Sequence, residues 1–477
     1  MDKVVKTLRE AIQLSGLKDG GRISFHHHLR NGDYVLNMVM EELASMGFKN
    51  LSVNASSLFD CHLPLIDHIK NGVVTEIITD YVSGGFGAAL SEGVLEKPVQ
   101  FYTHGGRPAA IINGSTPIDV AFIGAPTADT MGNMTGKIGK SACGSMGYAY
   151  ADAMYAEKVI AITDNLVPYP LPMPSIDETY VDYVVSVDEI GNPAGIVSGT
   201  TKITRDPVGL VMAETAAKAI KASGLLKDGF SFQTGAGGAT LAAAQFVKDI
   251  MIKENIKGSF GCGGVTGYMV DMLNAGCFES LVDVQCFDLK AVESIRTNPK
   301  HVEVSAMRYA SPFAKSAAVD SLDVVLLGAT EVDVDFNVNV HTDSNGRMMG
   351  GSGGHSDTAA GAKMAMIIAP LSRARLPIVT ERVFCKSTPG NTVDVLVTQK
   401  GVAVNPARPE LAAALKDGGI KVVDIQELKK AAEQLCGSPK PLVRGDRVLP
   451  FLRTGCSSLR RLPGVCWLQR KGGQRCP

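Results

Sequence analysis

The stretch Gly350–Ala362 (GGSGGHSDTAAGA) sets polar side chains among small residues, a pattern that can bind an anion or stabilise an oxyanion. Glycine lets the backbone N–H groups of such a loop approach a ligand closely. The stretch also runs into an expected helix start, where negative charge is favoured. We take Gly353, Gly354 and His355 as candidate catalytic residues, with a tight structural turn as the alternative.

Histidines and arginines that follow expected strands could bind a carboxylate substrate. His26, His27 and His28 come directly after an expected strand, and Arg30 lies two residues further on. Three consecutive residues at a strand end point to both faces, so at least one should reach a cleft. Arg107, in the sequence THGGR, brings a guanidinium that can bind a carboxylate through two hydrogen bonds. For each of these side chains a solvated position without a role is the alternative.

Two further loops resemble known chemical motifs to different degrees. Ser83–Gly87 (SGGFG) has the form of an oxyanion-stabilising turn, which makes Gly84 and Gly85 candidates. Gly136–Ser145 lacks the spacing of a nucleotide-binding phosphate loop, since Met134 stands five residues before Gly139. Cys143, in the same loop, fits a buried structural cysteine better than a nucleophile, because no base is evident nearby. The histidines have no carboxylate or cysteine partners at ligand spacing, so no metal is expected.

Length and composition bound the class of protein. A chain of 477 residues is expected to form two or three domains. With 45% hydrophobic and 20% charged residues it is typical of soluble globular proteins. A net charge of −1 argues against broad binding to nucleic acid or to anionic membranes. No apolar run reaches the ~20 residues of a transmembrane helix, and the scattered cysteines favour a reduced, cytoplasmic chain.

Strands alternate with helices along the chain. Strands are expected at Ile23–Phe25, Leu51–Val53, Val74–Ile78, Val99–Tyr102, Val120–Ile123 and Val159–Ile162, and helices at Tyr34–Met46 and Pro64–Asn71. This alternation predicts an α/β fold with mainly parallel sheets covered by helices.

The second half of the chain repeats the first. Leu17–His28 matches Leu226–Gly235, and Ile123–Asp129 (IGAPTAD) matches Leu327–Asp333 (LGATEVD). Gly350–Ala362 matches a similar stretch near residue 140, and the two are separated by nearly the same number of residues as the other matches. Three matches in one register indicate a tandem duplication. We expect related domains at residues 1–212 and 213–443, with their glycine loops at one cleft beyond the strand ends.

Specific motifs then resemble one family, the alpha subunit of citrate lyase, a CoA-transferase. The motifs are ISFHHHLRNGD, IGAPTAD, TDNLVPYP, DGFSFQTG, GGHSDTAA and VTQKGVAVNP. The resemblance implies a tandem CoA-transferase fold and a bacterial cytoplasmic complex with a citryl lyase subunit and a small acyl carrier protein. The carrier would present its acyl thioester on a phosphoribosyl-dephospho-CoA arm. We assign Gly350, Gly351 and Ser356 to that arm, and Asp357 to the substrate together with the histidines and arginines.

One departure from the wider superfamily bears on mechanism. Many members carry a nucleophilic glutamate, whose position falls near Gly263 here, and no carboxylate follows until Asp271. We therefore expect citrate to attack the acetyl thioester directly, which gives a mixed anhydride and then citryl-carrier and acetate. Binding two anions and a thioester in line is mostly a matter of proximity. The alternatives are a citramalate CoA-transferase, a stand-alone acyl-CoA:carboxylate CoA-transferase, and a non-catalytic scaffold subunit.

The end of the chain departs from the family pattern. Residues 444–477 hold three of the ten cysteines and the only tryptophan, with Asp446 as their only acid. Leu442–Pro477 lacks the alternation of a strand, and Pro450 and Pro463 interrupt it. We expect a basic tail, either out of frame or disordered, that leaves the second domain with an unpaired edge strand. A genuine basic extension that binds a partner is the alternative.

Overall fold

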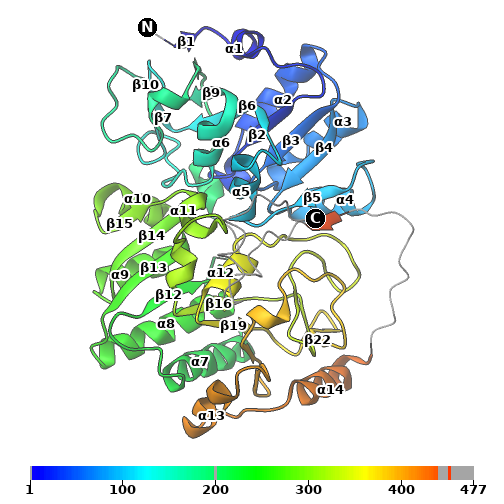
Figure 1. Ribbon diagram of the computed structural model, residues 1–477, viewed down its shortest axis with the longest axis vertical. Helices are drawn as coiled ribbons and strands as arrows, with labels where there is room; N and C mark the ends of the chain where they lie inside the picture. The colour runs from blue at the N-terminus through cyan, green and yellow to red at the C-terminus, as the bar shows by residue number, and fades with distance from the viewer. Residues whose placement is uncertain (1–2, 198–200, 439–449, 453–477) are drawn as a thin grey trace, which may run out of the picture.

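The computed structural model describes residues 3–197, 201–438 and 450–452, and it forms two α/β halves stacked end to end (Figure 1). In the main sheet of the first half every strand pairing is parallel. In sheet order the strands are β1 (Val4–Val5), β11 (Tyr183–Ser186), β9 (Ala156–Thr163), β6 (Ile118–Ala125), β2 (Arg22–Phe25), β3 (Leu51–Ala55), β4 (Val74–Thr79), β5 (Val99–Phe101) and β25 (Pro450–Leu452).

The second half repeats this arrangement with a single antiparallel pair, β23 with β24, at one edge of its main sheet. In sheet order its strands are β15 (His301–Glu303), β14 (Phe278–Cys286), β13 (Gly258–Val265), β12 (Ser231–Thr234), β16 (Val324–Leu327), β19 (Met364–Ile368), β23 (Val395–Val397) and β24 (Val402–Val404). The run VVLL of β16 is buried throughout, as expected for a parallel strand covered on both faces.

Helices alternate with these strands, and three small sheets complete the fold. The helices are α1 (Leu8–Ser15), α2 (Val35–Ser45), α3 (Leu65–Lys70), α4 (Gly84–Ser91), α5 (Gly106–Ile112), α6 (Ala149–Tyr155), α7 (Pro207–Ala222), α8 (Gly238–Lys253), α9 (Gly267–Asn274), α10 (Leu289–Thr297), α11 (Ala306–Ala310), α12 (His355–Gly361), α13 (Pro409–Asp417) and α14 (Ile425–Cys436). The small sheets are β10–β7–β8 (Leu166–Val167, Thr127–Asp129, Met134–Thr135), β18–β17–β22 (Val338–Asn339, Glu331–Asp333, Val379–Thr380) and β20–β21 (Ser372–Arg373, Leu376–Pro377). None of the described helices is long and apolar enough to cross a membrane.

The predicted α/β fold and the predicted duplication are confirmed. The strand order β9-β6-β2-β3-β4-β5 of the first sheet equals β19-β16-β12-β13-β14-β15 of the second. Polar contacts are repeated as well. The Asn133 side chain donates to the Asp129 carboxylate, and Asn337 donates to Asp333 in the same way. Both halves retain this hydrogen bond after the duplication because it satisfies the buried polar groups of the corresponding loop.

Two expectations about the organisation of the chain meet the structure only in part. The boundary expected between residues 212 and 213 falls inside α7, whose N-cap is Asp206 and which packs against α8. Most of the tail at residues 444–477 lies outside the described residues. The strand β25 was not expected, because Pro450 argues against a strand, yet it pairs with β5 at the sheet edge where proline is tolerated.

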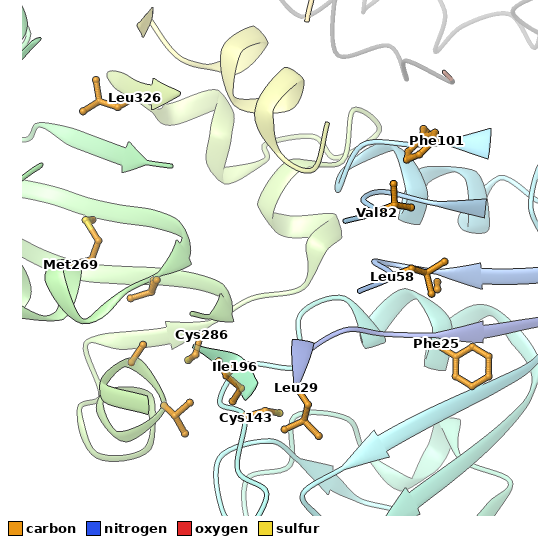
Figure 2. Close-up of a cluster of buried hydrophobic side chains, with 14 of the residues drawn as sticks. Phe25, Leu29, Leu58, Val82, Phe101, Cys143, Ile196, Met269, Cys286 and Leu326 are labelled. Atoms are coloured by element: carbon orange, nitrogen blue, oxygen red, sulfur yellow. The ribbon is translucent and has the colours of Figure 1, made fainter. Parts of the chain in front are cut away.

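A segment of the second half, Met348–Gly354, docks on the first half and is called the docking segment below. The backbone N–H of Met348 donates to Ser91 Oγ at 2.7 Å, and the His104 N–H donates to the Gly353 carbonyl at 2.9 Å. Gly353 also forms a β-bridge with Thr103. Met348 belongs to a hydrophobic core cluster that contains buried side chains of both halves, ten of which Figure 2 labels.

The buried Met348 gives a test of how far this contact stabilises the protein. Met348→Ala removes a side chain that is 2% exposed and should lower the free energy of unfolding by about 2–5 kcal/mol. The neighbouring Met349 is 44% exposed, so Met349→Ala should change it by less than about 0.5 kcal/mol. Urea unfolding of both variants measures the difference. Equal effects would mean that Met348 contributes no more than a surface residue.

Candidate functional site

A cavity of about 340 Å³ lies between the two halves, beyond the carboxyl ends of β2, β12 and β16. This is where ligands bind in parallel α/β sheets. Its lining from the first half consists of His27, Arg30, Ser57, Phe59, Tyr81, His104 and Tyr148. Its lining from the second half consists of residues 233–237, Gly264, Gln285, Phe287, Tyr309, Leu327, Gly328 and residues 351–355.

The predicted cleft between the glycine loops therefore exists, and it collects six of the predicted site residues. They are His27, Arg30, Gly351, Gly353, Gly354 and His355. Eight others do not line it. They are His26, His28, Gly84, Gly85, Arg107, Gly350, Ser356 and Asp357.

Arg107 was expected to bind the substrate, and the structure contradicts this. Its side chain is 2% exposed and lies on α5, where its Nη2 donates to the Asp152 carboxylate at 2.9 Å. Its Nε donates to Asn54 Oδ1 at 2.7 Å. Because Asp152 stabilises the charge, the pKa of Arg107 is raised although burial opposes it. The guanidinium is thus a structural cation that links α5, β3 and α6.

Gly84 and Gly85 do not form an oxyanion site. Gly84 has a φ of +58°, and a Cβ there would overlap the Asp60 carboxylate. The Gly85 N–H donates to Asp60 Oδ1 at 2.7 Å, which occupies the amide. The SGGFG turn is therefore a structural helix start at α4, in which the Gly85 N–H donates to Asp60 and neither Gly84 nor Gly85 lines the cavity.

The polar residues of the second glycine loop are also structural. Asp357 is fully buried and accepts hydrogen bonds from the Thr103 hydroxyl at 2.9 Å and the Gly105 N–H at 2.8 Å. Ser356 donates to the Ser387 carbonyl at 2.8 Å. A Cβ at Gly350 would overlap the carbonyl oxygen of Val340. These three residues therefore hold the loop in place and do not line the cavity.

His26 and His28 lie behind the cavity, with their Nδ1 atoms in contact with each other. The Tyr148 N–H donates to His28 Nε2 at 3.3 Å. Burial lowers the pKa of His26 to about 4 and that of His28 well below its usual value. Both lowered pKa values favour the neutral ring, and His28 supports Tyr148 while His26 contacts His28, so neither ring lines the cavity as a substrate-binding residue would.

His355 lines the cavity, but both of its ring nitrogens are already engaged. Its Nε2 donates to the Gly328 carbonyl at 2.9 Å, so Nδ1 accepts from the Thr388 hydroxyl at 2.7 Å. Burial lowers its pKa to about 4. Since neither nitrogen is free to exchange a proton with a ligand, the expected catalytic role of His355 is replaced by fixing the Gly328 carbonyl.

His27 presents a hydrogen-bond donor to the cavity. Ser56 Oγ accepts from the His27 backbone N–H at 3.1 Å and lies 2.6 Å from His27 Nδ1. Among the described residues, Nδ1 is the acceptor in reach of the Ser56 hydroxyl, so the hydroxyl donates to it. Burial holds the pKa of His27 well below its usual value. The ring is therefore neutral, and its proton sits on Nε2, where a ligand can accept it.

Arg30 is the guanidinium that the cavity offers. It lies 4.8 Å from the ring centroid of Phe287 and 5.7 Å from that of Phe59, so aromatic rings of both halves hold it. Its Nη1 is buried and has no hydrogen-bond partner among the described residues. Its backbone φ is +52°, an unfavourable conformation for a side chain of this size. A hydrogen bond from this Nη1 to an anion would offset the cost of burying an unpaired donor.

Sequence reasoning passed over several residues that line the cavity. In the THGGR motif it is His104 that lines the cavity, while Arg107 does not. His104 Nδ1 lies 3.1 Å from Asp80 Oδ2. Tyr148 stacks against His27 with ring centroids 4.6 Å apart. Gln233 donates to the Tyr309 hydroxyl at 2.8 Å. The position of His104 just beyond β5 was the available signal for it, since residues at the carboxyl ends of parallel strands face ligands.

No aspartate or glutamate occurs among the residues lining the cavity in the part of the chain that the structure describes. Gly263 has a φ of +106°, and a Cβ there would lie 2.7 Å from the Gln233 side chain. At Gly264 a side chain would meet the ring of Phe287. The cavity therefore provides no carboxylate nucleophile at the place where the superfamily glutamate was sought.

One buried group of possible metal ligands lies outside the cavity lining. Asp283 Oδ2 accepts from His301 Nε2 at 3.1 Å and from Cys286 Sγ at 3.0 Å. His301 Nδ1 contacts Ser294 Oγ at 3.0 Å. The three side chains thus satisfy one another as a hydrogen-bonded network. Cys143, which lies near Cys286 in Figure 2, is buried, and burial raises the pKa of its thiol.

Comparison with known proteins gives one consistent result. The family model "Citrate lyase, alpha subunit (CitF)" matches residues 1–460. The citrate lyase alpha chain of Klebsiella pneumoniae is 49% identical over 451 residues, which cover 94% of this chain and 89% of that one. The Escherichia coli (strain K12) citrate lyase alpha chain is 48% identical over 451 residues, covering 94% and 88%.

Solved structures agree with this result. The alpha subunit of citrate lyase from Streptococcus mutans, in complex with citrate, superposes with a TM-score of 0.93 at 48% identity, covering 95% of this chain and 89% of that one. A malonate decarboxylase alpha subunit from Acinetobacter baumannii superposes with a TM-score of 0.67 at 16% identity, covering 92% and 93%. The second likeness shows a shared fold and nothing more.

Removal of the Arg107 charge should weaken the fold and leave ligand selection unchanged. Arg107→Met strands the buried Asp152 carboxylate, which should cost about 3–5 kcal/mol of unfolding free energy. Arg9→Met, at a side chain that is 49% exposed, is the matched control and should cost less than about 0.5 kcal/mol. Urea unfolding measures both. Selective loss of carboxylate binding by a folded Arg107→Met enzyme of unchanged stability would restore the ligand role.

Proposed function

Because the chain belongs to the citrate lyase alpha subunit family, we propose that it exchanges acetyl for citrate on an acyl-carrier thioester within the cavity between its halves. As a member of this family it is a citrate CoA-transferase and a subunit of a citrate lyase complex. The observation that carries the proposed site is Arg30, with an unpaired Nη1 in a cavity whose described lining has no acid.

Citrate binding uses the donors that face the cavity. Arg30 offers a planar guanidinium that can take one carboxylate of citrate through two hydrogen bonds. His27 adds its Nε2–H from a ring fixed by Ser56. Together they orient one terminal carboxylate of citrate toward the thioester carbonyl, which replaces a bimolecular encounter with a positioned one.

The acyl transfer proceeds through a mixed anhydride. A citrate carboxylate oxygen attacks the acetyl carbonyl, and the carrier thiolate leaves. The thiolate then attacks the citryl carbonyl, which gives citryl-carrier and releases acetate. Each attack passes through a tetrahedral oxyanion that needs donors. Gly237 lines the cavity as the N-cap of the 16-residue helix α8 and has no side-chain cap, so first-turn N–H groups of α8 supply these donors.

The partners follow from the reaction. The thioester is carried by the phosphoribosyl-dephospho-CoA arm of the acyl carrier protein, and a citryl lyase subunit cleaves the citryl product. We place this complex in the cytoplasm. The cavity is lined by glycine at residues 235, 237, 264, 328, 351, 353 and 354, which leaves the backbone open to a narrow pantetheine-like arm.

Arg30→Lys tests the site directly. Lysine keeps the positive charge but loses the paired hydrogen bonds and the stacking between Phe59 and Phe287, so the KM for citrate should rise about 10–100-fold. The KM for acetyl-CoA, used as surrogate donor, should stay within about twofold. Arg9→Lys on α1 is the control, with wild-type constants expected for both substrates. An equal rise in both KM values for Arg30→Lys would place the guanidinium outside citrate recognition.

Incubation of the purified chain with acetyl-CoA alone should leave its mass unchanged, because no carboxylate lines the described cavity. Borohydride treatment followed by intact mass spectrometry is the measurement. Exchange assays with citrate and citramalate as acceptors accompany it and should show faster exchange with citrate. An adduct mapped to any Asp or Glu would establish a covalent enzyme intermediate and overturn the direct mechanism.

A further inference from the structure

The cavity carries little positive charge for a substrate with three carboxylates. Among the lining residues that the structure describes, Arg30 is the one residue of the lysine or arginine type. Burial lowers the pKa of His104 and of His355 to about 4 and holds that of His27 well below its usual value. In the empty enzyme all three rings are neutral. One guanidinium therefore faces an anion that carries nearly three negative charges at neutral pH.

Asp80 lies directly behind His104 and is poorly solvated for an ionised carboxylate. It follows β4 and is fully buried, with Oδ2 3.1 Å from His104 Nδ1. Its Oδ1 is buried without a hydrogen-bond partner among the described residues. By contrast Asp152 has the guanidinium of Arg107, and Asp357 has a hydroxyl and a backbone N–H. An ionised Asp80 would have a single hydrogen bond to a neutral ring, which is costly in a buried site.

The charged neighbours do not remove this cost. Burial raises the pKa of Asp80 well above its usual value, and the nearby Arg107 opposes this while Asp152 adds to it. At His104, Asp357 favours the protonated ring and Arg107 disfavours it, with burial the larger cause of its lowered pKa. The uncharged rings of Tyr148 and His27 lie 4.5 and 5.9 Å from that of His104. Without a bound anion, the proton between Asp80 Oδ2 and His104 Nδ1 therefore sits on Asp80, and the neutral ring of His104 carries its own proton on Nε2.

On this geometry, and resting on the proposed function, we propose that Asp80 stores a proton that it passes to His104 when a citrate carboxylate binds beside His104 Nε2. The O–H bond on Asp80 Oδ2 breaks as an N–H bond forms on His104 Nδ1, so no proton is taken from solvent. The imidazolium then faces the substrate anion with Nε2–H, while the new Asp80 carboxylate stays paired with Nδ1–H. The cavity gains a second cation only when an anion is present to stabilise it.

The docking segment leaves room for this contact. No described residue bonds to His104 Nε2, and a Cβ at Gly353 would lie 3.2 Å from it. Gly353 has a φ of +50°, which only glycine adopts without strain. The imidazole edge is therefore kept open toward the cavity by a glycine of the other half.

Titration calorimetry of citrate binding, in buffers of different ionisation enthalpy, tests the stored proton. Between pH 7.5 and 8.5 the wild-type Kd should stay constant, with no net proton uptake. Asp80→Asn keeps the shape but cannot supply the proton, so its Kd should rise by about tenfold per pH unit as His104 must draw on solvent. Asp67→Asn, at a carboxylate that is 77% exposed, is the control and should match wild type.

The outcomes separate this inference from the proposed function. Absence of citrate binding and exchange in the wild type would overturn both. Two results would overturn the stored proton alone, provided that the wild type exchanges acetyl for citrate. One is uptake of one proton by the wild type on citrate binding, and the other is the same pH dependence of Kd in Asp80→Asn as in the wild type. Should Asp80→Asn not fold, nitrogen-15 histidine NMR of the wild type decides. The signal of His104 is the one that His104→Gln lacks. Addition of citrate at pH 8 should change this signal from that of a neutral ring to that of an imidazolium, and an unchanged neutral signal would contradict the inference.

Discussion

The contact between the docking segment and the ends of β4 and β5 determines whether a site exists at all. Thr103 and Gly353 pair as strands do, and Asp357 accepts from Thr103 and Gly105 across the same junction. A Cβ at Gly105 would overlap the Ala310 carbonyl, and one at Gly351 would overlap that of Asp80. The glycines of both halves are thus required first for close approach of two backbones. The cavity is the space between the two halves next to this close contact.

Burial controls the chemistry of this space. It keeps the lining histidines neutral and makes an unpaired charge costly, so Arg30 and the Asp80–His104 pair matter more than the many charges on the surface. A site without a carboxylate nucleophile has no stored negative charge to repel an incoming citrate. The absence of acids from the described lining therefore favours binding of a polyanion.

The sequence predicts much of this fold because its signals are periodic and local. Strands such as Ile23–Phe25 and helices such as Tyr34–Met46 were expected close to where β2 and α2 lie, and the internal matches predict the common strand order. The sequence could not show which of Arg30 and Arg107 faces the cavity, since both follow a strand. What separates them is Asp152, which lies 45 residues beyond Arg107 in sequence yet binds its guanidinium. Nor could the sequence show that Asp60 accepts the hydrogen bond of the Gly85 N–H, because the two residues lie 25 positions apart.

Citrate labelled with oxygen-18 in its carboxylates tests whether the acyl group passes from carrier to citrate without a covalent bond to the protein. In a single turnover with acetyl-carrier, a mixed anhydride leaves one citrate oxygen on the acetate released. Mass spectrometry of that acetate should therefore show one oxygen-18 atom per molecule and an unlabelled protein. Unlabelled acetate together with oxygen-18 in an Asp or Glu side chain would contradict the account.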